Sequence, residues 1–140
     1  MSDKYAALKQ AAESATAGEW RSDDHHGVIA DAGLNGNYYI ASCSGPEHRA
    51  NKRFIAAANP ATILELLAER DADRARIAEL TEALRHSVAG YKSCLRMGHD
   101  RIIDLGGDCD SPEVMIAGNP DIQQAEKVLS ADISLKIEGE

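Results

Sequence analysis

Histidine and carboxylate side chains gather between residues 23 and 26, in the sequence Asp-Asp-His-His, and all four are potential metal ligands. Adjacent histidines point in different directions in most backbones, so two of them seldom bind one ion together. Other histidines and cysteines lack the short paired spacings of structural zinc sites; they are His86, Cys94, His99 and Cys109. The sequence therefore predicts a solvated loop at residues 23–26 and no metal site.

Carboxylates near residue 110 superficially suggest a calcium-binding loop. The residues concerned are Asp104, Asp108, Asp110 and Glu113. They do not follow the spacing of an EF-hand, and no acidic residue stands at the expected closing position. Helix capping and complementarity with helix dipoles explain these carboxylates without a cation.

Three small side chains that could act as nucleophiles, Ser42, Cys43 and Ser44, precede His48. A nucleophile and base would need a supporting motif such as the GxSxG elbow, and none is present. Gly106-Gly107 lacks the lysine and the preceding strand of a phosphate-binding loop. We therefore expect no catalytic residue, no cofactor and no enzymatic activity.

Short elements are predicted around these residues in the first part of the chain. Apolar residues recur at helical spacing from Tyr5 to Ala15 and predict an N-terminal helix over about residues 2–17. Two β-rich runs lie between Gly27 and Cys43, on either side of Asn35-Gly36, a pair that type I′ turns favour. They predict a β-hairpin, which a flanking helix must cover because two strands alone are marginal in water.

A second helical segment runs from Glu47 to Ala58 and is followed by Asn59-Pro60. Asn is a favoured N-cap and Pro is tolerated at the first helical position, so a new helix should begin at Pro60. That helix is long and carries a stripe at heptad spacing, with one eleven-residue step that relaxes left-handed supercoiling. We call this stripe the seam; it comprises Ile63, Leu66, Arg70, Asp73, Ile77, Leu80, Leu84, Val88, Tyr91 and Leu95.

The seam predicts a coiled coil between copies of the chain. Residues 70–86 are too charged to be wrapped on all sides, which favours an intermolecular coiled coil over one helix of a monomeric bundle. Arg70 and Asp73 interrupt the stripe, and such a polar layer costs stability but can fix register or helix number. The number and orientation of the helices stay open.

Helix signals recur in the last third of the sequence. Gly106-Gly107 predicts the end of the long helix. The run Asp110-Ser111-Pro112-Glu113 has the pattern of a capping box, and Asn119-Pro120 should begin a helix that continues to about Leu129. Apolar and polar residues alternate over residues 131–137, which predicts an edge strand or a frayed tail.

Together these elements predict a mostly helical α+β fold, with an N-terminal helix, a small β-hairpin, a long central coiled-coil helix and short C-terminal helices. We expect an N-terminal module over residues 1–59, an oligomerisation helix over residues 60–105 and an acidic helical tail over residues 106–140. Aromatic residues make up only 4% of the chain, so the core must consist mainly of Ala, Ile and Leu. Such side chains suit helix-on-helix packing.

The net charge of −8 lies mainly in the C-terminal third, where residues 98–140 carry ten acidic residues against three basic ones. This balance repels nucleic-acid phosphates and argues against direct DNA or RNA binding. Three widely separated cysteines argue against a disulfide framework. With no apolar leader and no run that approaches a membrane span, we expect a soluble protein of the cytoplasm.

Residues 54–80, FIAAANPATILELLAERDADRARIAEL, resemble the Ead/Ea22-like family of early-region accessory proteins of phages and prophages. In that family an Ala-rich segment leads through Asn-Pro into a leucine-rich helix and coiled coil. Residues 7–20, ALKQAAESATAGEW, are similar to the family's N-terminal helix and following Trp. The resemblance covers roughly residues 5–85. It implies a non-enzymatic phage protein, oligomeric through its central helix, that is associated with early infection or the choice between lysis and lysogeny.

Three functions remain open from the sequence. The first is a homo-oligomeric accessory protein that binds and modulates a host or phage protein. The second is an acidic mimic of nucleic acid that inhibits a host defence or transcription protein, through Asp100, Asp104, Asp108, Asp110 and Glu113. The third is a sponge for small nucleotide signals, with pockets between subunits.

Overall fold

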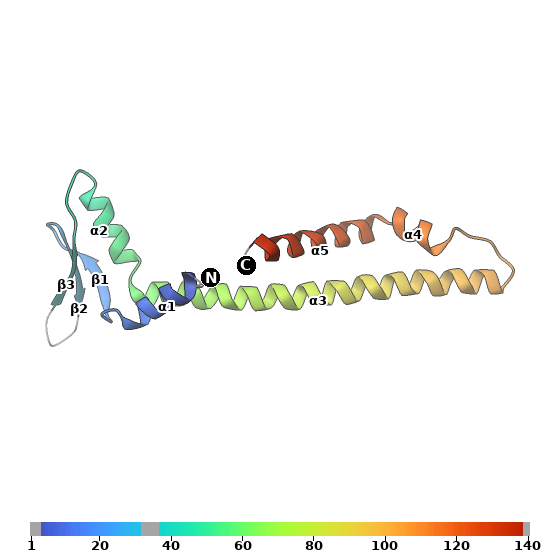
Figure 1. The fold of residues 1–140 in the computed structure, drawn as a ribbon, viewed down its shortest axis with the longest axis horizontal. Helices are drawn as coiled ribbons and strands as arrows, with labels where there is room; N and C mark the ends of the chain where they lie inside the picture. Colours follow the sequence, from blue (N-terminus) through green and yellow to red (C-terminus); the bar gives the residue numbers. More distant parts are fainter. Residues whose placement is uncertain (1–3, 32–36, 139–140) are drawn as a thin grey trace. The chain divides into compact units, whose positions relative to one another are not determined.

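The computed structural model describes residues 4–31 and 37–138 and confirms a mostly helical α+β fold. The chain divides into two compact units, Met1–Asp73 and Arg74–Glu140, which we call the N-terminal and C-terminal units. The N-terminal unit contains α1 (Lys4–Ser14), β1 (Glu19–Ser22), β2 (Gly27–Asp31), β3 (Asn37–Ser42) and α2 (His48–Ala57). Helix α3 (Pro60–Asp104) begins in that unit and continues into the C-terminal unit, which also holds α4 (Pro112–Gly118) and α5 (Pro120–Glu138) (Figure 1).

Within the described residues, the sheet has three antiparallel strands in the order β1-β2-β3. The pairing of β2 with β3 confirms the predicted hairpin, while its predicted turn residues, Asn35 and Gly36, lie outside the described residues. Strand β1 was not predicted, because its four residues, EWRS, are too few and too polar to show an alternating pattern. It adds a third strand to a hairpin that would be marginal alone.

The core of the N-terminal unit lies between the sheet and α2, which packs against β1 and β2 (Figure 1). Val28 and Ala30 alternate along β2 and are fully buried. Trp20, opposite Ala30 in β1, is half-buried, and its Nε1–H donates to the carbonyl oxygen of Thr16 at 3.0 Å. The indole therefore ties the connection after α1 to the edge of the sheet.

The predicted helix boundaries around α3 are confirmed. The side chain of Asn59 accepts a hydrogen bond from the backbone N–H of Thr62 at 3.0 Å, and α3 starts at Pro60. At the other end, Gly106 has φ +78 and its N–H donates to the carbonyl oxygen of Ile103. This left-handed glycine ends the helix.

The C-terminal helices begin where their caps predict. The Ser111 hydroxyl accepts from the N–H of Val114 before α4, and the Asn119 side chain accepts from the N–H groups of Asp121 and Ile122 before α5. The prediction of an edge strand or frayed tail at residues 131–137 is wrong, because α5 continues through them to Glu138. Once a helix is nucleated, each further residue adds a hydrogen bond, so a weak alternation does not stop it.

Replacing Gly18 tests the turn that leads from α1 into the sheet. Gly18 has φ +106, and a Cβ there would lie 2.4 Å from the carbonyl oxygen of Asp31. We expect Gly18→Ala to destabilise the N-terminal unit by about 1–3 kcal/mol, because the backbone is strained and the partner strand must move. Urea unfolding followed by Trp20 fluorescence measures the loss. Gly98→Ala, where a Cβ meets nothing within 4 Å, is the control, and an equal loss in both variants would contradict the prediction.

Candidate functional site

The C-terminal unit is an antiparallel helical hairpin in which α5 runs back along α3 (Figure 1). Lys92 of α3 forms an ion pair with Glu126 of α5. Further along, the amide nitrogen of Asn119 donates to the hydroxyl of Tyr91 at 2.9 Å. Ile122, which lies between these two contacts in sequence, is only 1% exposed. Side-chain packing and polar contacts thus both hold the hairpin together.

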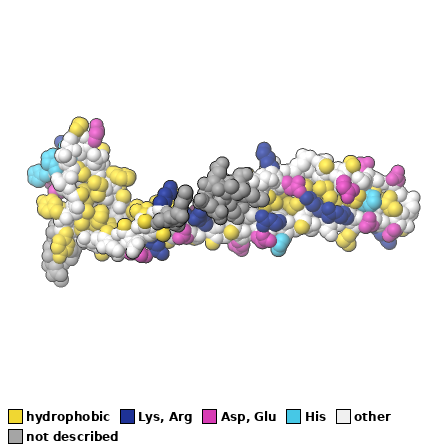
Figure 2. Space-filling view, viewed as in Figure 1, with side chains coloured by type: hydrophobic (Ala, Val, Ile, Leu, Met, Phe, Trp, Pro, Cys, Tyr) yellow, Lys and Arg dark blue, Asp and Glu magenta, His cyan; other side chains and the backbone are white. Residues whose placement is uncertain are grey.

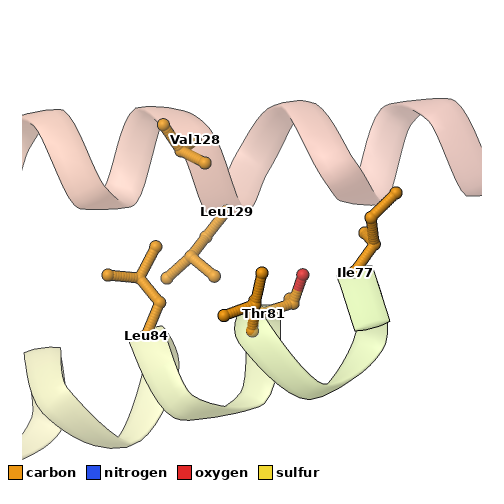
Figure 3. Close-up of a pocket in the computed structure, with 6 residues that line it drawn as sticks. Ile77, Thr81, Leu84, Val128 and Leu129 are labelled. Atoms are coloured by element: carbon orange, nitrogen blue, oxygen red, sulfur yellow. The ribbon is translucent and has the colours of Figure 1, made fainter. Parts of the chain in front are cut away.

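An apolar groove lies between the two helices where α5 passes the middle of α3 (Figure 3). Its volume is about 220 Å³. The lining residues are Ile77, Leu80, Thr81 and Leu84 from α3, and Val128 and Leu129 from α5. Leu129 points from α5 toward Leu84 and Thr81, and closes one side of the groove (Figure 3).

Three residues of this groove expose about half of their surface. The exposed fraction is 53% for Ile77 and 52% for both Leu80 and Val128. Single exposed apolar residues are normal on protein surfaces, whereas exposed apolar residues gathered around one groove offer apolar area that a partner can bury. We refer to this feature as the apolar groove, and we take its six lining residues as the candidate interaction surface.

The predicted seam lies entirely on α3, and α5 of the same chain covers part of it. Leu84, Val88 and Leu95 are half-buried. The exposed apolar residues of the seam are Leu66, Ile77, Leu80 and Tyr91, of which Ile77 and Leu80 line the groove. The cover from α5 was missed by the sequence interpretation. The spacing of Ile122 and Leu129 gives the signal, because they fall two helical turns apart on one face of α5.

The polar positions of the seam differ in their surroundings. The guanidinium carbon of Arg70 lies 3.9 Å from the centre of the Tyr5 ring, in a cation–π contact between α3 and α1. Arg70 also pairs with Asp71 at 3.2 Å. Asp73 is exposed. Arg70 is therefore engaged within its own chain, and a role of these residues in fixing the register of a coiled coil stays a prediction.

The predicted acidic surface is exposed at every position. Asp100 and Asp104 belong to the last turns of α3, Glu113 to the first turn of α4, and the other two lie in the connection between these helices; the full set is Asp100, Asp104, Asp108, Asp110 and Glu113. Glu113 complements the dipole at the start of α4. Asp100 lies 3.1 Å from the Nδ1 atom of His99.

The loop at residues 23–26 is anchored by a lysine from α2. Lys52 is only 5% exposed, and its ammonium donates to the carbonyl oxygens of Asp23 and His25 at 2.7 and 2.6 Å. The Asp23 carboxylate lies 3.8 Å from the same ammonium and accepts from the N–H groups of His25 and Gly27. We call Asp23 and Lys52, with the backbone groups that they bind, the lysine clamp.

Electrostatics in the lysine clamp follow from these contacts. The hydrogen bond from the Gly27 N–H is the main reason that the pKa of Asp23 lies below its ordinary value of 3.8, and the nearby Lys52 acts in the same direction. Burial acts against both. Asp24, His25 and His26 are exposed, as expected of a solvated loop, whereas Asp23 turns inward. The sequence did not predict the lysine clamp, because lysine is usually exposed and no pattern around Lys52 indicates its burial.

The side chains that were considered as metal ligands or nucleophiles differ in their surroundings. Among residues 4–31 and 37–138, no group of three or more His, Cys, Asp or Glu residues is arranged to hold a metal ion. Cys43 is buried, and Ser42 and Ser44 are exposed. The His48 ring packs against that of His26, and its Nδ1 atom is buried without a hydrogen-bond partner among the described residues.

The sequence model of one protein family, described as Ead/Ea22-like protein, matches residues 3–134. The chain belongs to this family. The resemblance noted for residues 5–85 is thus confirmed and extends through α4 and most of α5, and membership assigns this Ead/Ea22-like chain to bacteriophage proteins. No curated protein and no solved structure matches the chain. None of the described helices has an apolar stretch long enough to cross a membrane.

Removing the ammonium of Lys52 tests the lysine clamp. Lys52→Met keeps most of the side-chain volume but leaves two part-buried carbonyl oxygens without their donor, so we expect a loss of about 2 kcal/mol in the stability of the N-terminal unit. Trp20 fluorescence during urea unfolding measures it. Arg53→Met removes the same charge from an exposed position of α2 and should have little effect. Equal losses in the two variants would show that charge alone, and no specific contact, is responsible.

Proposed function

We propose that this Ead/Ea22-like chain is a non-enzymatic, self-associating accessory protein that binds and modulates a host or phage protein. The apolar groove of the α3–α5 hairpin is the observation that carries this proposal. Its lining is apolar except for Thr81, and three of its residues are half-exposed. None of the residues that line it is cationic, so this groove itself does not support binding of a nucleotide signal, for which the sequence hypothesis places pockets between subunits.

A helix with apolar residues at matching spacing is the partner that this surface fits. Ile77, Leu80 and Leu84 follow the i, i+3, i+7 pattern by which a helix and an apolar groove recognise each other. Burying the exposed half of each such side chain is worth roughly 1 kcal/mol. A second copy of the chain carries the same stripe, so the surface can pair with itself about a two-fold axis.

The charges beside the groove do not oppose such pairing. Arg76 pairs with Glu79 at 2.7 Å, and Arg85 pairs with Glu82 at 2.5 Å, each within α3. In each of these exposed pairs the two charges neutralise one another, and the pair itself adds little to the stability of the fold. The apolar residues can therefore approach a partner without bringing a net charge of one sign with them.

Self-association would also strengthen binding to a different protein. An oligomer presents several copies of the N-terminal unit, and linked copies bind a multivalent target more tightly than one copy does. The aromatic side chains of that unit include exposed Tyr38, Tyr39 and Phe54, which are suitable contact residues for a protein partner.

Leu80→Glu tests the proposed self-association. We expect the wild-type chain to be oligomeric at micromolar concentration, and the variant to dissociate at least about tenfold more readily, because a buried carboxylate costs more than the 1.4 kcal/mol that a factor of ten requires. Size-exclusion chromatography with light scattering measures both. Ala75→Glu adds the same charge to the opposite face of α3 and should leave the mass unchanged. A wild-type chain that is strictly monomeric would remove the basis of the proposal.

A second candidate function rests on the exposed acidic residues near the end of α3. All five carboxylates of the predicted acidic surface face solvent, so they are available to a basic partner that normally binds nucleic acid. Electrostatic steering of that kind accelerates association and weakens as salt is added. A solvated, solubilising surface would show neither effect.

Neutralising Asp108 and Asp110 distinguishes an acidic surface that mimics nucleic acid from one that only keeps the protein solvated. If it mimics nucleic acid, proteins captured from a bacterial host extract by the immobilised chain should be lost with Asp108→Asn/Asp110→Asn, and also between roughly 0.05 and 0.5 M salt. The matched control, Glu65→Gln/Glu69→Gln, removes two exposed acids of the N-terminal unit and should retain them. Capture that is indifferent to salt and to the first pair of substitutions would exclude the mimic.

A further inference from the structure

The histidines beside the lysine clamp have no part in the proposed function, yet they join two elements of the N-terminal unit. We propose that His48 is an acid-sensitive latch, which holds the start of α2 against the loop between β1 and β2 while it is neutral and releases it when protonated. His48 is the first residue of α2, and His26 belongs to the loop.

The geometry of the ring contact supports a latch that works only in the neutral state. The centres of the His26 and His48 rings are 4.6 Å apart and the rings are tilted by 56°. The Nδ1 atom of His48 is buried and has no hydrogen-bond partner among the described residues. A proton added to this imidazole would therefore place a charge where no acceptor receives it.

The groups around His48 are mainly basic. Arg49 and Lys52 come from α2, and His26 comes from the loop. Asp23 is the carboxylate on the loop side of the cluster that turns inward, and its oxygen is already engaged by two backbone N–H groups and faces Lys52. The other nearby carboxylates, Asp24 and Glu47, are exposed to solvent. A protonated His48 would thus meet cations rather than a counter-ion.

The direction of the titration follows from this environment. Burial is the main cause that lowers the pKa of His48 below its ordinary value of 6.5, and His26, Arg49 and Lys52 lower it further. The unfolded chain accepts a proton on His48 near pH 6.5, whereas the folded chain resists it. The stabilising contribution of neutral His48 is therefore full above pH 6.5 and is lost as the pH falls through the lower pKa of His48 in the folded state.

The clamp carboxylate does not titrate in the pH range of the proposed test. The pKa of Asp23 lies below 3.8, so this carboxylate remains ionised between about pH 7.5 and 5.5. Any loss between about pH 7.5 and 5.5 is thus unrelated to Asp23. Because Lys52 binds the same loop from one helical turn further along α2, a cation on His48 would push the loop and the helix apart at the clamp.

The experiment uses the full chain and its single tryptophan, which lies in the N-terminal unit. Urea unfolding followed by Trp20 fluorescence at about pH 7.5 and about pH 5.5 should give a lower midpoint at the acidic pH for the wild-type chain. His48→Phe keeps a ring against His26 but removes the titrating nitrogen, so its midpoint should change little between the two. His86→Gln, at an exposed position of α3, is the control and should retain the full wild-type shift.

Two results would overturn the latch. One is a wild-type midpoint that does not fall between the two pH values, and the other is a His48→Phe variant that shows the same fall as the wild type. If the Phe variant does not fold, NMR titration of the His48 ring protons in the wild-type chain decides instead. A pKa below 6.5, with the Trp20 resonances shifting along the same curve, supports the latch; a pKa at or above 6.5 refutes it.

Discussion

A helix of 45 residues must find cover for its apolar side chains, and this requirement governs most of the structure. Isolated helices gain little stability from their own hydrogen bonds, so packing must supply the rest. Near its start, α3 packs within the N-terminal unit, where Leu67 is buried and Arg70 stacks on Tyr5. In the C-terminal unit, α5 returns along α3 and meets it at Leu84 and at Lys92. The stripe around Ile77 and Leu80 receives only partial cover, which makes it the natural place for a partner.

The N-terminal unit solves a different problem, which is how to order a small sheet with few large side chains. Its fully buried residues on β2 are Val28 and Ala30, whose volumes are small. Lys52 compensates by reaching from α2 to two loop carbonyl oxygens that are 27 and 29 residues away in sequence. A buried ammonium is costly unless it is fully hydrogen-bonded, so such a contact specifies one arrangement of helix and loop. Because Lys52 lies so close to the loop, the stability of the N-terminal unit is sensitive to any further charge beside the lysine clamp.

Local sequence signals predicted where the helices begin and end. Most contacts between residues that are distant in sequence could not be predicted. Asn59-Pro60 and Gly106 act through their own backbone preferences, and the structure confirms both. Strand β1 carries too few residues for a periodic pattern, and it forms because β2 offers it a partner. The seam shows which residues of α3 need cover, but a heptad pattern does not name the helix that supplies it. Lys52 is the clearest case, because its burial depends on loop carbonyl groups that no sequence pattern encodes.

The cover supplied by α5 and self-association through the seam are compatible. An apolar stripe on a core-facing helix is 100° wide or more, so two different helices can pack along its two flanks. Leu84 faces α5 through Leu129, whereas Ile77 and Leu80 keep half of their surface in water. A helical hairpin with one such flank open is the unit from which antiparallel four-helix bundles are built, by pairing two hairpins. In this view α5 supplies the first layer of cover, and the second copy in our proposal supplies the next along the same groove.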